Sequence, residues 1–472
     1  MDSSVAARGK ESVQKRSPLD LIMNQLRRKT SFTERKKTSV GRLFRPSESS
    51  DRKNGGTPEI KESDLSEGKE NKEPERGEAL DCIPLIEVLD LSWNVGIGAG
   101  NFRHFTEQIQ PENRLKDLRL VDCQLSETDI TALSEALPLL SGLEELDLSN
   151  NKLSIKGMEN LTSSFSATPR LKTLKLSMCG LGKDHLSALG QAFRFITALE
   201  HMDLSCNKEA GGGLSTLAAN LLLLTHLRSL DMHLCCLTKD DVLTLVQVAP
   251  SLKELRELDL SSNKSVGDTL QNLLQSLPLS QMNKLPLNNC DLSDSACQAL
   301  ATVMQTLKRL ESLNLSWNKC VGENLREFLE PLQADCKLQE LRLSSCNLTT
   351  EDVLHLESAC QRGALSQLKL LDLSYNGSVG DGGWTSLFGK AASLKGLEEL
   401  DVSLRPSASL SVSPWLPALL EALPQLTSLS RLSLQHWTLS SAERDKLEKI
   451  LSKKSAILEC DRLNTPTPKA AG

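Results

Sequence analysis

Residues whose side chains could bind a ligand or react lie close together in the stretch LNLSWNKCVGENL, which spans residues 313–325. Trp317 could hold a ligand there, and Cys320 could act as a nucleophile. A nucleophilic cysteine needs a base beside it, and none is evident near Cys320 in the sequence. The seven histidines show no metal-binding spacing such as H-E-x-x-H. We therefore expect no catalytic residue, no cofactor and no metal, and an enzyme is the least favoured alternative.

The same stretch contains one copy of a frame, Leu-x-x-Leu-x-Leu-x-x-Asn/Cys, that recurs along the chain. Thirteen copies are present, and the last two, LEELDVSLR and LSRLSLQHW, are degenerate. The ninth residue alternates between asparagine and cysteine and returns every 27 to 30 residues. An asparagine there can bond backbone groups that would otherwise be buried unpaired, and a cysteine is readily buried. These structural ladder residues are Asn94, Cys123, Asn151, Cys179, Asn207, Cys235, Asn263, Cys290, Asn318, Cys346 and Asn376.

The spacing of the frame predicts the fold. In Leu-x-Leu the two leucines face the same side of a short strand. A unit of about 28 residues has room for a strand, a turn, a helix and a return loop, and it buries its leucines only against its neighbours. Because helices are wider than strands, the array should curve with its sheet inside. We expect a right-handed α/β solenoid (a horseshoe) of about thirteen repeats, with a concave parallel sheet, convex helices and strands near 88–92, 117–121, 145–149 and 173–177.

The turn and helix signals in each unit depend on whether the ninth residue of the frame is cysteine or asparagine. Units after cysteine carry helix starts of the capping-box kind, with aspartate in place of the usual glutamate: Ser126 with Asp129, Thr238 with Asp241, and Thr349 with Asp352. Units after asparagine carry glycine-rich turns such as NKSVGD and NKCVGEN. We expect these glycines to supply positive φ or a close approach of backbones.

Alternating units of about 28 residues that end in asparagine and cysteine resemble the ribonuclease-inhibitor type of leucine-rich repeat. The resemblance covers roughly residues 80 to 440. It implies a non-enzymatic horseshoe that holds protein partners with aromatic residues at its rim, and it supplies no catalytic residue.

The ends of the chain lie outside this pattern. Residues 1–79 should be a disordered tail that is first basic and then acidic, because residues 1–50 hold 12 Lys and Arg against 5 Asp and Glu. Residues 18–28 could form a short helix, either frayed or docking. The motifs RRKT and RKKTS suggest phosphorylation, and the basic segment could weakly contact anionic lipid. The candidate acceptors are Thr30, Ser31, Thr38 and Ser39, and the remaining boundaries are 80–440 for the solenoid, 441–460 for a capping helix and 461–472 for a loose tail.

Charged residues mark one candidate surface for partners. The residue between the two central leucines of each frame points away from the core. Its charge mostly alternates from frame to frame, which favours pairing between neighbouring strands. Asp203, Asp231 and Asp259 break the alternation. They form a candidate contact patch for a basic partner, and pairing within the sheet is the alternative.

Aromatic residues mark a second candidate surface. They make up only 3% of the chain, so their placement is informative. Trp93, Trp317, Tyr375 and Trp437 all occupy the eighth or ninth position of a frame. Trp317 and Tyr375 should be two strands apart, about 10 Å, with Arg342 on the strand between them. Trp, Tyr and Arg are enriched in interface hot spots, so we expect protein binding here, with packing onto a neighbouring loop as the alternative.

Bulk properties narrow the function. The net charge of −6 offers no nucleic-acid-binding surface, and no apolar run is long enough for a membrane span. Thirteen cysteines without a secretory signal indicate a reducing compartment, the cytoplasm or also the nucleus, and not secretion. The sequence therefore predicts an intracellular scaffold or inhibitor that binds one or more proteins through its concave face and rim. The alternative is a phospho-regulated adaptor that acts mainly through its basic tail.

Overall fold

The structure is a computed structural model, and it describes residues 86–461. These residues divide at Leu171 into an N-terminal unit, 86–171, and a C-terminal unit, 172–461. The expected tail, the possible helix at 18–28, the four candidate phosphorylation sites and the segment after 461 lie outside the described residues, with Asp461 as the last of them. No helix between residues 86 and 461 is long and apolar enough to cross a bilayer.

The N-terminal unit alternates strands with helices. Its strands are β1 (Val88–Asp90), β2 (Asp117–Arg119) and β3 (Glu145–Asp147). Its helices are α2 (Phe102–Thr106), α3 (Glu127–Ala136) and α4 (Ile155–Ser163), followed in two cases by the short 3-10 helices η2 (Leu137–Leu139) and η3 (Ser164–Ala167).

The C-terminal unit continues the same order of elements. Its main strands are β4 (Thr173–Lys175), β5 (His201–Asp203), β6 (Ser229–Asp231), β7 (Glu257–Asp259), β8 (Lys284–Pro286), β9 (Ser312–Asn314), β10 (Glu340–Arg342), β11 (Leu370–Asp372), β12 (Glu399–Asp401), β14 (Arg431–Ser433) and β16 (Ile457–Glu459), and a separate pair is formed by β13 (Leu410–Ser411) and β15 (Trp437–Thr438). Its helices are α5 (Lys183–Ala192), α6 (Leu214–Leu221), α7 (Lys239–Val248), α8 (Ser265–Ser276), α9 (Asp294–Val303), α10 (Leu325–Leu329), α11 (Thr350–Gln361), α12 (Asp381–Gly389), α13 (Leu416–Ala422) and α14 (Ser441–Ser452). The 3-10 helices are η4 (Ala249–Ser251), η5 (Leu279–Gln281), η6 (Met304–Thr306), η7 (Lys319–Val321) and η8 (Ala391–Leu394).

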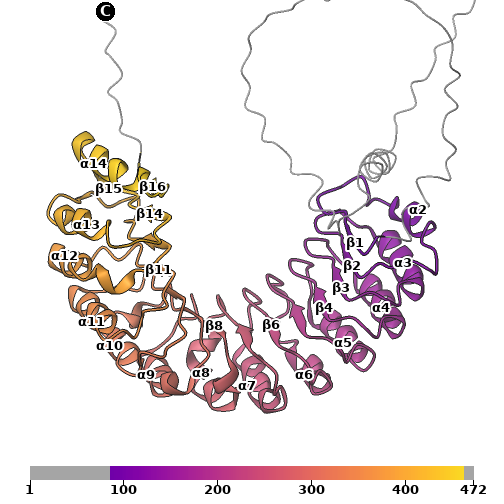
Figure 1. Ribbon diagram of the computed structural model, residues 1–472. Helices are drawn as coiled ribbons and strands as arrows, with labels where there is room; N and C mark the ends of the chain where they lie inside the picture. Colours follow the sequence, from indigo (N-terminus) through magenta and orange to yellow (C-terminus); the bar gives the residue numbers. More distant parts are fainter. Residues whose placement is uncertain (1–85, 462–472) are drawn as a thin grey trace, which may run out of the picture. The chain divides into compact units, whose positions relative to one another are not determined.

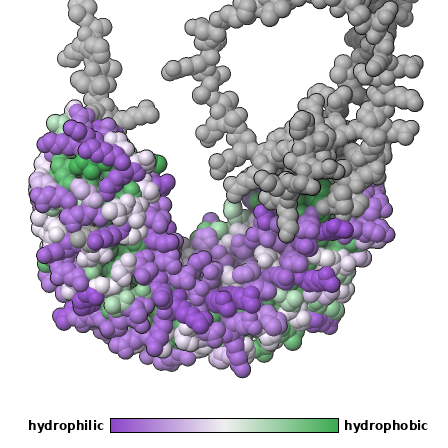
Figure 2. All heavy atoms as spheres, viewed as in Figure 1, coloured by the Kyte–Doolittle hydropathy of each residue, from purple (hydrophilic) through white to green (hydrophobic). Residues whose placement is uncertain are grey.

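These elements confirm the α/β leucine-rich repeat solenoid. All strand pairs within each unit are parallel, and the register aligns frame leucines, as with Leu313 and Leu341 of β9 and β10. Within each unit the strands line one side and the helices the other (Figure 1). The central leucines are almost all buried, and Figure 2 shows hydrophilic residues over most of the visible surface of the C-terminal unit. Within each unit, strands and helices thus share a leucine core, as nearest-neighbour stacking requires.

The ladder asparagines join neighbouring repeats. Asn318 is 2% exposed, and its amide nitrogen donates to the carbonyls of Leu287 at 2.7 Å and Leu315 at 2.9 Å. Its amide oxygen accepts the N–H groups of Cys290 at 3.1 Å and Leu292 at 3.2 Å. One side chain therefore satisfies backbone groups of two successive repeats where the chain leaves the strand. The same bonds recur at Asn151, Asn207, Asn263 and Asn376.

The capping boxes confirm the predicted helix starts, and the structure explains their aspartates. Ser126 and Asp129 exchange side-chain and backbone bonds at the start of α3. The same carboxylate also accepts the N–H groups of Gly100 at 2.9 Å and Phe102 at 3.0 Å, which begin α2 in the preceding repeat. Asp129 is fully buried, so its carboxylate serves two helix N-termini. Asp241 repeats the arrangement with Gly212 and Leu214, and Asp352 repeats the capping box and accepts one N–H of the preceding repeat, that of Glu323 at 3.0 Å.

The glycine-rich turns use close approach more than positive φ. A Cβ on Gly267 would lie 2.2 Å from the carbonyl oxygen of Asp291, and one on Gly322 would lie 2.2 Å from that of Asn347. Gly212, by contrast, has a φ of +77°. Both expected roles of glycine are therefore present, and the first one lets a turn pack directly on the next repeat's backbone.

The expected helix over 441–460 is wrong at its C-terminal end. Helix α14 ends at Ser452, and Ile457–Glu459 form strand β16, which pairs in parallel with β14. Ser455 has a φ of +57°, and the Ala456 N–H donates to the Leu451 carbonyl at 3.0 Å, which closes the helix as a left-handed C-cap does. The chain then places Leu458 beside Leu432, so the sheet gains a strand that no frame predicted.

Candidate protein-interaction surface

The eighth residue of the frame lies where the chain turns away from the strand. In twelve frames this residue has a positive φ, between 52° and 66°: Trp93, Asp122, Asn150, Met178, Cys206, Leu234, Ser262, Asn289, Trp317, Ser345, Tyr375 and His436. Asparagine and aspartate adopt this conformation readily, whereas other side chains pay roughly 1 kcal/mol. The turn is architecture, but it does not require an aromatic residue. Large aromatic rings at this position therefore need a separate reason.

Trp317 and Tyr375 form a pair across two strands. Their ring centroids lie 6.3 Å apart with an interplanar angle of 57°. This is closer than the separation of their strands, because the residue between them in the row is Ser345, whose side chain is small and buried. Trp317 is 56% exposed and Tyr375 is half-buried. The pair thus presents a preformed aromatic surface to solvent.

The arginine in this row is not the expected one. Arg342 lies on β10, and its guanidinium is 3.9 Å from Glu340. Between residues 86 and 461, no cation–π contact joins it to either ring. Arg405 instead reaches the row, where its Nη2 donates to the Ser345 hydroxyl at 2.6 Å. The signal in the sequence was an arginine at the ninth frame position, where asparagine or cysteine is normal.

The two remaining aromatic candidates differ. Trp93 belongs to the N-terminal unit and is 57% exposed. The hypothesis that Trp437 contacts a partner is wrong, because Trp437 is 4% exposed and its indole N–H donates to the Val402 carbonyl at 2.7 Å. The inserted segment before α13 covers it: β13 pairs with β15, and the rings of Trp415 and Trp384 lie 4.9 Å and 6.3 Å from its ring.

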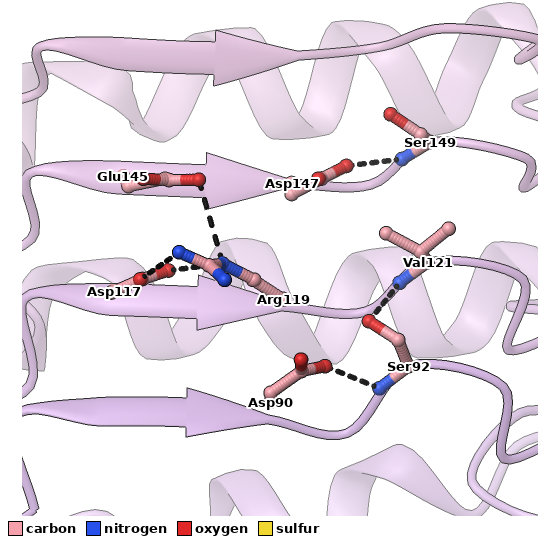
Figure 3. Close-up of polar contacts among 8 residues, drawn as sticks. All are labelled: Asp90, Ser92, Asp117, Arg119, Val121, Glu145, Asp147 and Ser149. Carbon is pink, nitrogen blue, oxygen red and sulfur yellow. Dashed lines mark hydrogen bonds and ion pairs between the residues drawn. The ribbon is translucent and has the colours of Figure 1, made fainter. Parts of the chain in front are cut away.

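The three aspartates lie side by side. Asp203, Asp231 and Asp259 are registered partners on β5, β6 and β7. Each carboxylate also accepts the backbone N–H two residues later, at 2.9 Å, so each one supports its own turn. Figure 3 shows this device in the N-terminal unit, where Asp90 and Asp147 accept from Ser92 and Ser149. Turn support explains why aspartate recurs in the frame, but it does not remove the repulsion among three adjacent acids.

The effect of burial, together with this repulsion, is seen in the pKa of the central aspartate, Asp231. Burial raises the pKa of Asp231 from its ordinary 3.8 to about 6, and repulsion from Asp259 and Asp203 acts in the same direction, while the His233 N–H opposes it. A carboxyl with a raised pKa stabilises the folded protein at low pH and loses that contribution as the pH rises through about 6. At neutral pH the ionised Asp231 is therefore held at a cost in stability, as residues of interaction sites often are.

Asp231→Asn should stabilise the protein at pH 7.5 by about 1 kcal/mol, after allowance for solvent screening. The amide oxygen can still accept the His233 N–H, as that of Asn314 accepts the Ser316 N–H at 3.1 Å in β9. The gain should vanish near pH 4, where the aspartate is already protonated. Urea unfolding at the two pH values tests this, and an equal effect at both would contradict it.

Most other charges of the strand side pair with one another. Arg119 lies 2.6 Å from Asp117 and 3.5 Å from Glu145 on the next strand (Figure 3). Other pairs between neighbouring strands or the residues before them are Lys116 with Glu87, Lys284 with Glu257, Lys369 with Glu398, and Arg431 with Glu459. Such exposed pairs each contribute less than about 1 kcal/mol. Pairing within the sheet thus accounts for much of the charge ladder.

Comparison with known proteins places this architecture. Family models described as Leucine Rich Repeat match residues 142–164, 253–269 and 334–356. The ribonuclease inhibitor of Sus scrofa is 31% identical to this chain over 313 residues, which cover 65% of this chain and 68% of that protein. The chain belongs to the ribonuclease-inhibitor family of leucine-rich repeat proteins.

Other relatives in the comparison match part of their own length. The Mus musculus ribonuclease inhibitor is 30% identical over 61% of this chain and 64% of that protein. NACHT, LRR and PYD domains-containing protein 3 of Rattus norvegicus is 32% identical over 56% of this chain, but only 26% of that protein is covered. The chain thus spans just under two thirds of the first of these relatives and about a quarter of the second.

The structure of this ribonuclease-inhibitor-type chain also shows a thiol–imidazole contact that the sequence analysis missed. The Cys206 sulfur lies 3.8 Å from both ring nitrogens of His233. Burial raises the pKa of Cys206, and the charges of Asp231 and Asp203 raise it further, so the thiol is not activated as a nucleophile. Within residues 86–461 no group of three or more His, Cys, Asp or Glu side chains could hold a metal ion.

Two adjacent thiols give a direct test of the ladder. Cys235 is fully buried, and burial raises its pKa to about 12, whereas Cys236 is exposed. Iodoacetamide at pH 8 should therefore alkylate Cys236 in the folded protein and spare Cys235 until urea unfolds it. Both lie in the tryptic peptide 229–239, so one fragmentation spectrum compares them in the same molecule. Equal labelling of the folded protein would contradict the burial of the ladder cysteine.

Proposed function

We propose that this chain is a non-enzymatic scaffold or inhibitor that binds a protein partner through its strand-lined face and the adjoining turns. The observation that carries the proposal is the Trp317–Tyr375 pair after β9 and β11, in which Trp317 is exposed and Tyr375 is half-buried. Two large rings in left-handed turns weaken the isolated chain slightly and gain contact area only against a partner. Membership of a family whose named members include ribonuclease inhibitors supports protein binding, without naming the partner.

Two further assignments belong to this proposal. The twelve free cysteines among the described residues support a reducing, intracellular compartment. The stretches LNLSWNKCVG and LDVSLRPS resemble the leucine-rich repeat-containing protein 31 group, and we place the chain there within its family. Under this proposal residues 80–440 form the binding array, and residues 1–79 are dispensable for the contact.

Trp317→Ala and Tyr375→Ala should each weaken partner binding by about 2 kcal/mol or more and leave the melting temperature nearly unchanged. Each removes a ring that is not among the buried core residues. Partners are first collected by proximity labelling with the wild-type chain, and the affinity of each purified partner is then measured for every variant. Deletion of residues 1–79 should leave binding intact, and its loss would favour the tail-based adaptor instead.

Two control variants separate binding from folding. Met178 occupies the same frame position as Trp317 and is equally exposed, at 56%, so Met178→Ala should bind normally. Leu315 is 1% exposed, so Leu315→Ala should lower the free energy of unfolding by roughly 2–5 kcal/mol. A Trp317→Ala protein that melts early and binds normally once folded would show that the tryptophan is a packing residue.

A further inference from the structure

Arg405 stands where the repeat does not allow a buried charge. It is the ninth residue of the degenerate frame LEELDVSLR, a position that ten other frames fill with a buried asparagine or cysteine. The residue before it, Leu404, is 1% exposed and lacks the positive φ found at the eighth position elsewhere. The chain therefore leaves β12 by a different path, and the arginine side chain lies outside the core.

The departing segment is anchored at its C-terminal end. Its strand β13 pairs with β15, and Trp415, which begins the next helix, is fully buried. The Trp415 ring lies 5.4 Å from that of Phe388 and 4.9 Å from that of Trp437. This aromatic cluster and strand β13 anchor the C-terminal end of the segment, and the Arg405 guanidinium at its other end is oriented by its bond to Ser345.

The Arg405 side chain extends back along the row of turns. Its Nη2 donates to the hydroxyl of Ser345, which lies between Trp317 and Tyr375 in the row. Four consecutive repeats therefore contribute one side chain each to a single surface. We call this surface the Trp317–Arg405 row, defined by Trp317, Ser345, Tyr375 and Arg405.

The Arg405 guanidinium has hydrogen-bond donors that make no bond within the described residues. Arginine has five N–H donors, and the bond to Ser345 uses one of them. The three arginines inside strands, Arg119, Arg342 and Arg431, each have a carboxylate within 4.0 Å. Arg405 is exposed and has no such carboxylate in the described part of the chain. Its guanidinium can therefore bind a carboxylate in a bidentate manner beside the two aromatic rings.

We propose that the Trp317–Arg405 row binds an acidic segment of a protein partner, with an aspartate or glutamate on Arg405 and an adjacent apolar side chain on Trp317 and Tyr375. This inference rests on the proposed function and names the chemistry of its partner. Charge complementarity selects the acidic residue, and the two rings bind its apolar neighbour. The bond to Ser345 orients the guanidinium before binding, which lowers the entropic cost of the contact.

A random peptide library displayed on phage tests this without a known partner. The full-length chain is the bait, and selected peptides are synthesised and measured against Trp317→Ala, Tyr375→Ala and Arg405→Gln. Peptides that need both rings should carry an aspartate or glutamate and should lose roughly tenfold or more in affinity with Arg405→Gln. Arg431→Gln, at an exposed arginine already paired with Glu459, should not change their affinity.

Two further experiments show whether a loss of affinity comes from the missing contact or from a folding defect of the variant. Changing the peptide's aspartate to asparagine should cause a similar loss with the wild-type chain and little further loss with Arg405→Gln. Selection on Arg405→Glu should enrich lysine and arginine at the same peptide position. Peptides that need Trp317 and Tyr375 but bind Arg405→Gln undiminished would overturn this inference and leave the proposed function standing. If no selected peptide needs either ring, both proposals fall.

Discussion

Asn318→Ala should lower the free energy of unfolding by about 4 kcal/mol. The substitution leaves the N–H groups of Cys290 and Leu292 without their acceptor, and it removes the donor that the Leu287 carbonyl uses. Cys290 is fully buried and Leu292 is 6% exposed, so water cannot replace these bonds without opening the turn. Each buried N–H left unpaired costs roughly 1–3 kcal/mol, and the small cavity adds to that.

Urea unfolding followed by circular dichroism measures this effect, with Asn94→Ala as the matched control. Asn94 is the first ladder residue and is half-buried. Among the described residues its amide donates only to carbonyls of its own turn, those of Leu91 at 2.8 Å and Ser92 at 3.0 Å. Its loss should cost about 1 kcal/mol. Equal effects of the two substitutions would mean that bonds between repeats contribute nothing beyond the local turn.

Gly322→Ala should lower the free energy of unfolding by about 3 kcal/mol or more. The reason is a steric clash and not the backbone conformation of Gly322. Gly322 has φ −59° and ψ 144°, values that alanine adopts without strain. The added Cβ, however, would lie 2.2 Å from the Asn347 carbonyl oxygen and 2.9 Å from that of Cys346. The Gly322 N–H also donates to the Cys346 carbonyl at 3.0 Å, so relief of the clash would stretch a bond between repeats.

Gly377→Ala is the control for this prediction. Gly377 follows the ladder asparagine of a later glycine-rich turn, and a Cβ there would meet nothing within 4 Å. Its substitution should change the free energy of unfolding by less than about 0.5 kcal/mol. Thermal and urea unfolding of both variants separates the two roles of glycine. Similar stability of the two variants would show that the close approach at Gly322 relaxes easily.

The repeating frame alone determined the architecture. Leu-x-Leu at intervals of 27 to 30 residues predicts strands at the places where β1 to β4 are found. The capping boxes and the glycine-rich turns could also be read from the sequence. These features depend on local geometry and on contacts between neighbouring repeats, and an array whose every unit stacks on the next repeats both.

Strand β16 was not predicted, because the local sequence signals used for the other elements do not indicate it. The Ser440–Glu443 capping box starts α14 as a helix signal should, but a left-handed turn at Ser455 ends it early. The following residues then cover the exposed edge of β14. The need to cover the last repeat comes from the sheet and not from the residues of the segment itself, so periodicity could not reveal it.

The candidate site depended on tertiary structure. Trp317 touches Tyr375 because the residue between them in the row is a serine, and a larger side chain there would hold the rings apart. Arg405 joins them by skipping a repeat, and Trp437 leaves the surface because an inserted segment covers it. The frame specifies which residue leaves the core at each turn. Where that side chain then points depends on the sizes of neighbours one and two repeats away, which only the folded array brings together.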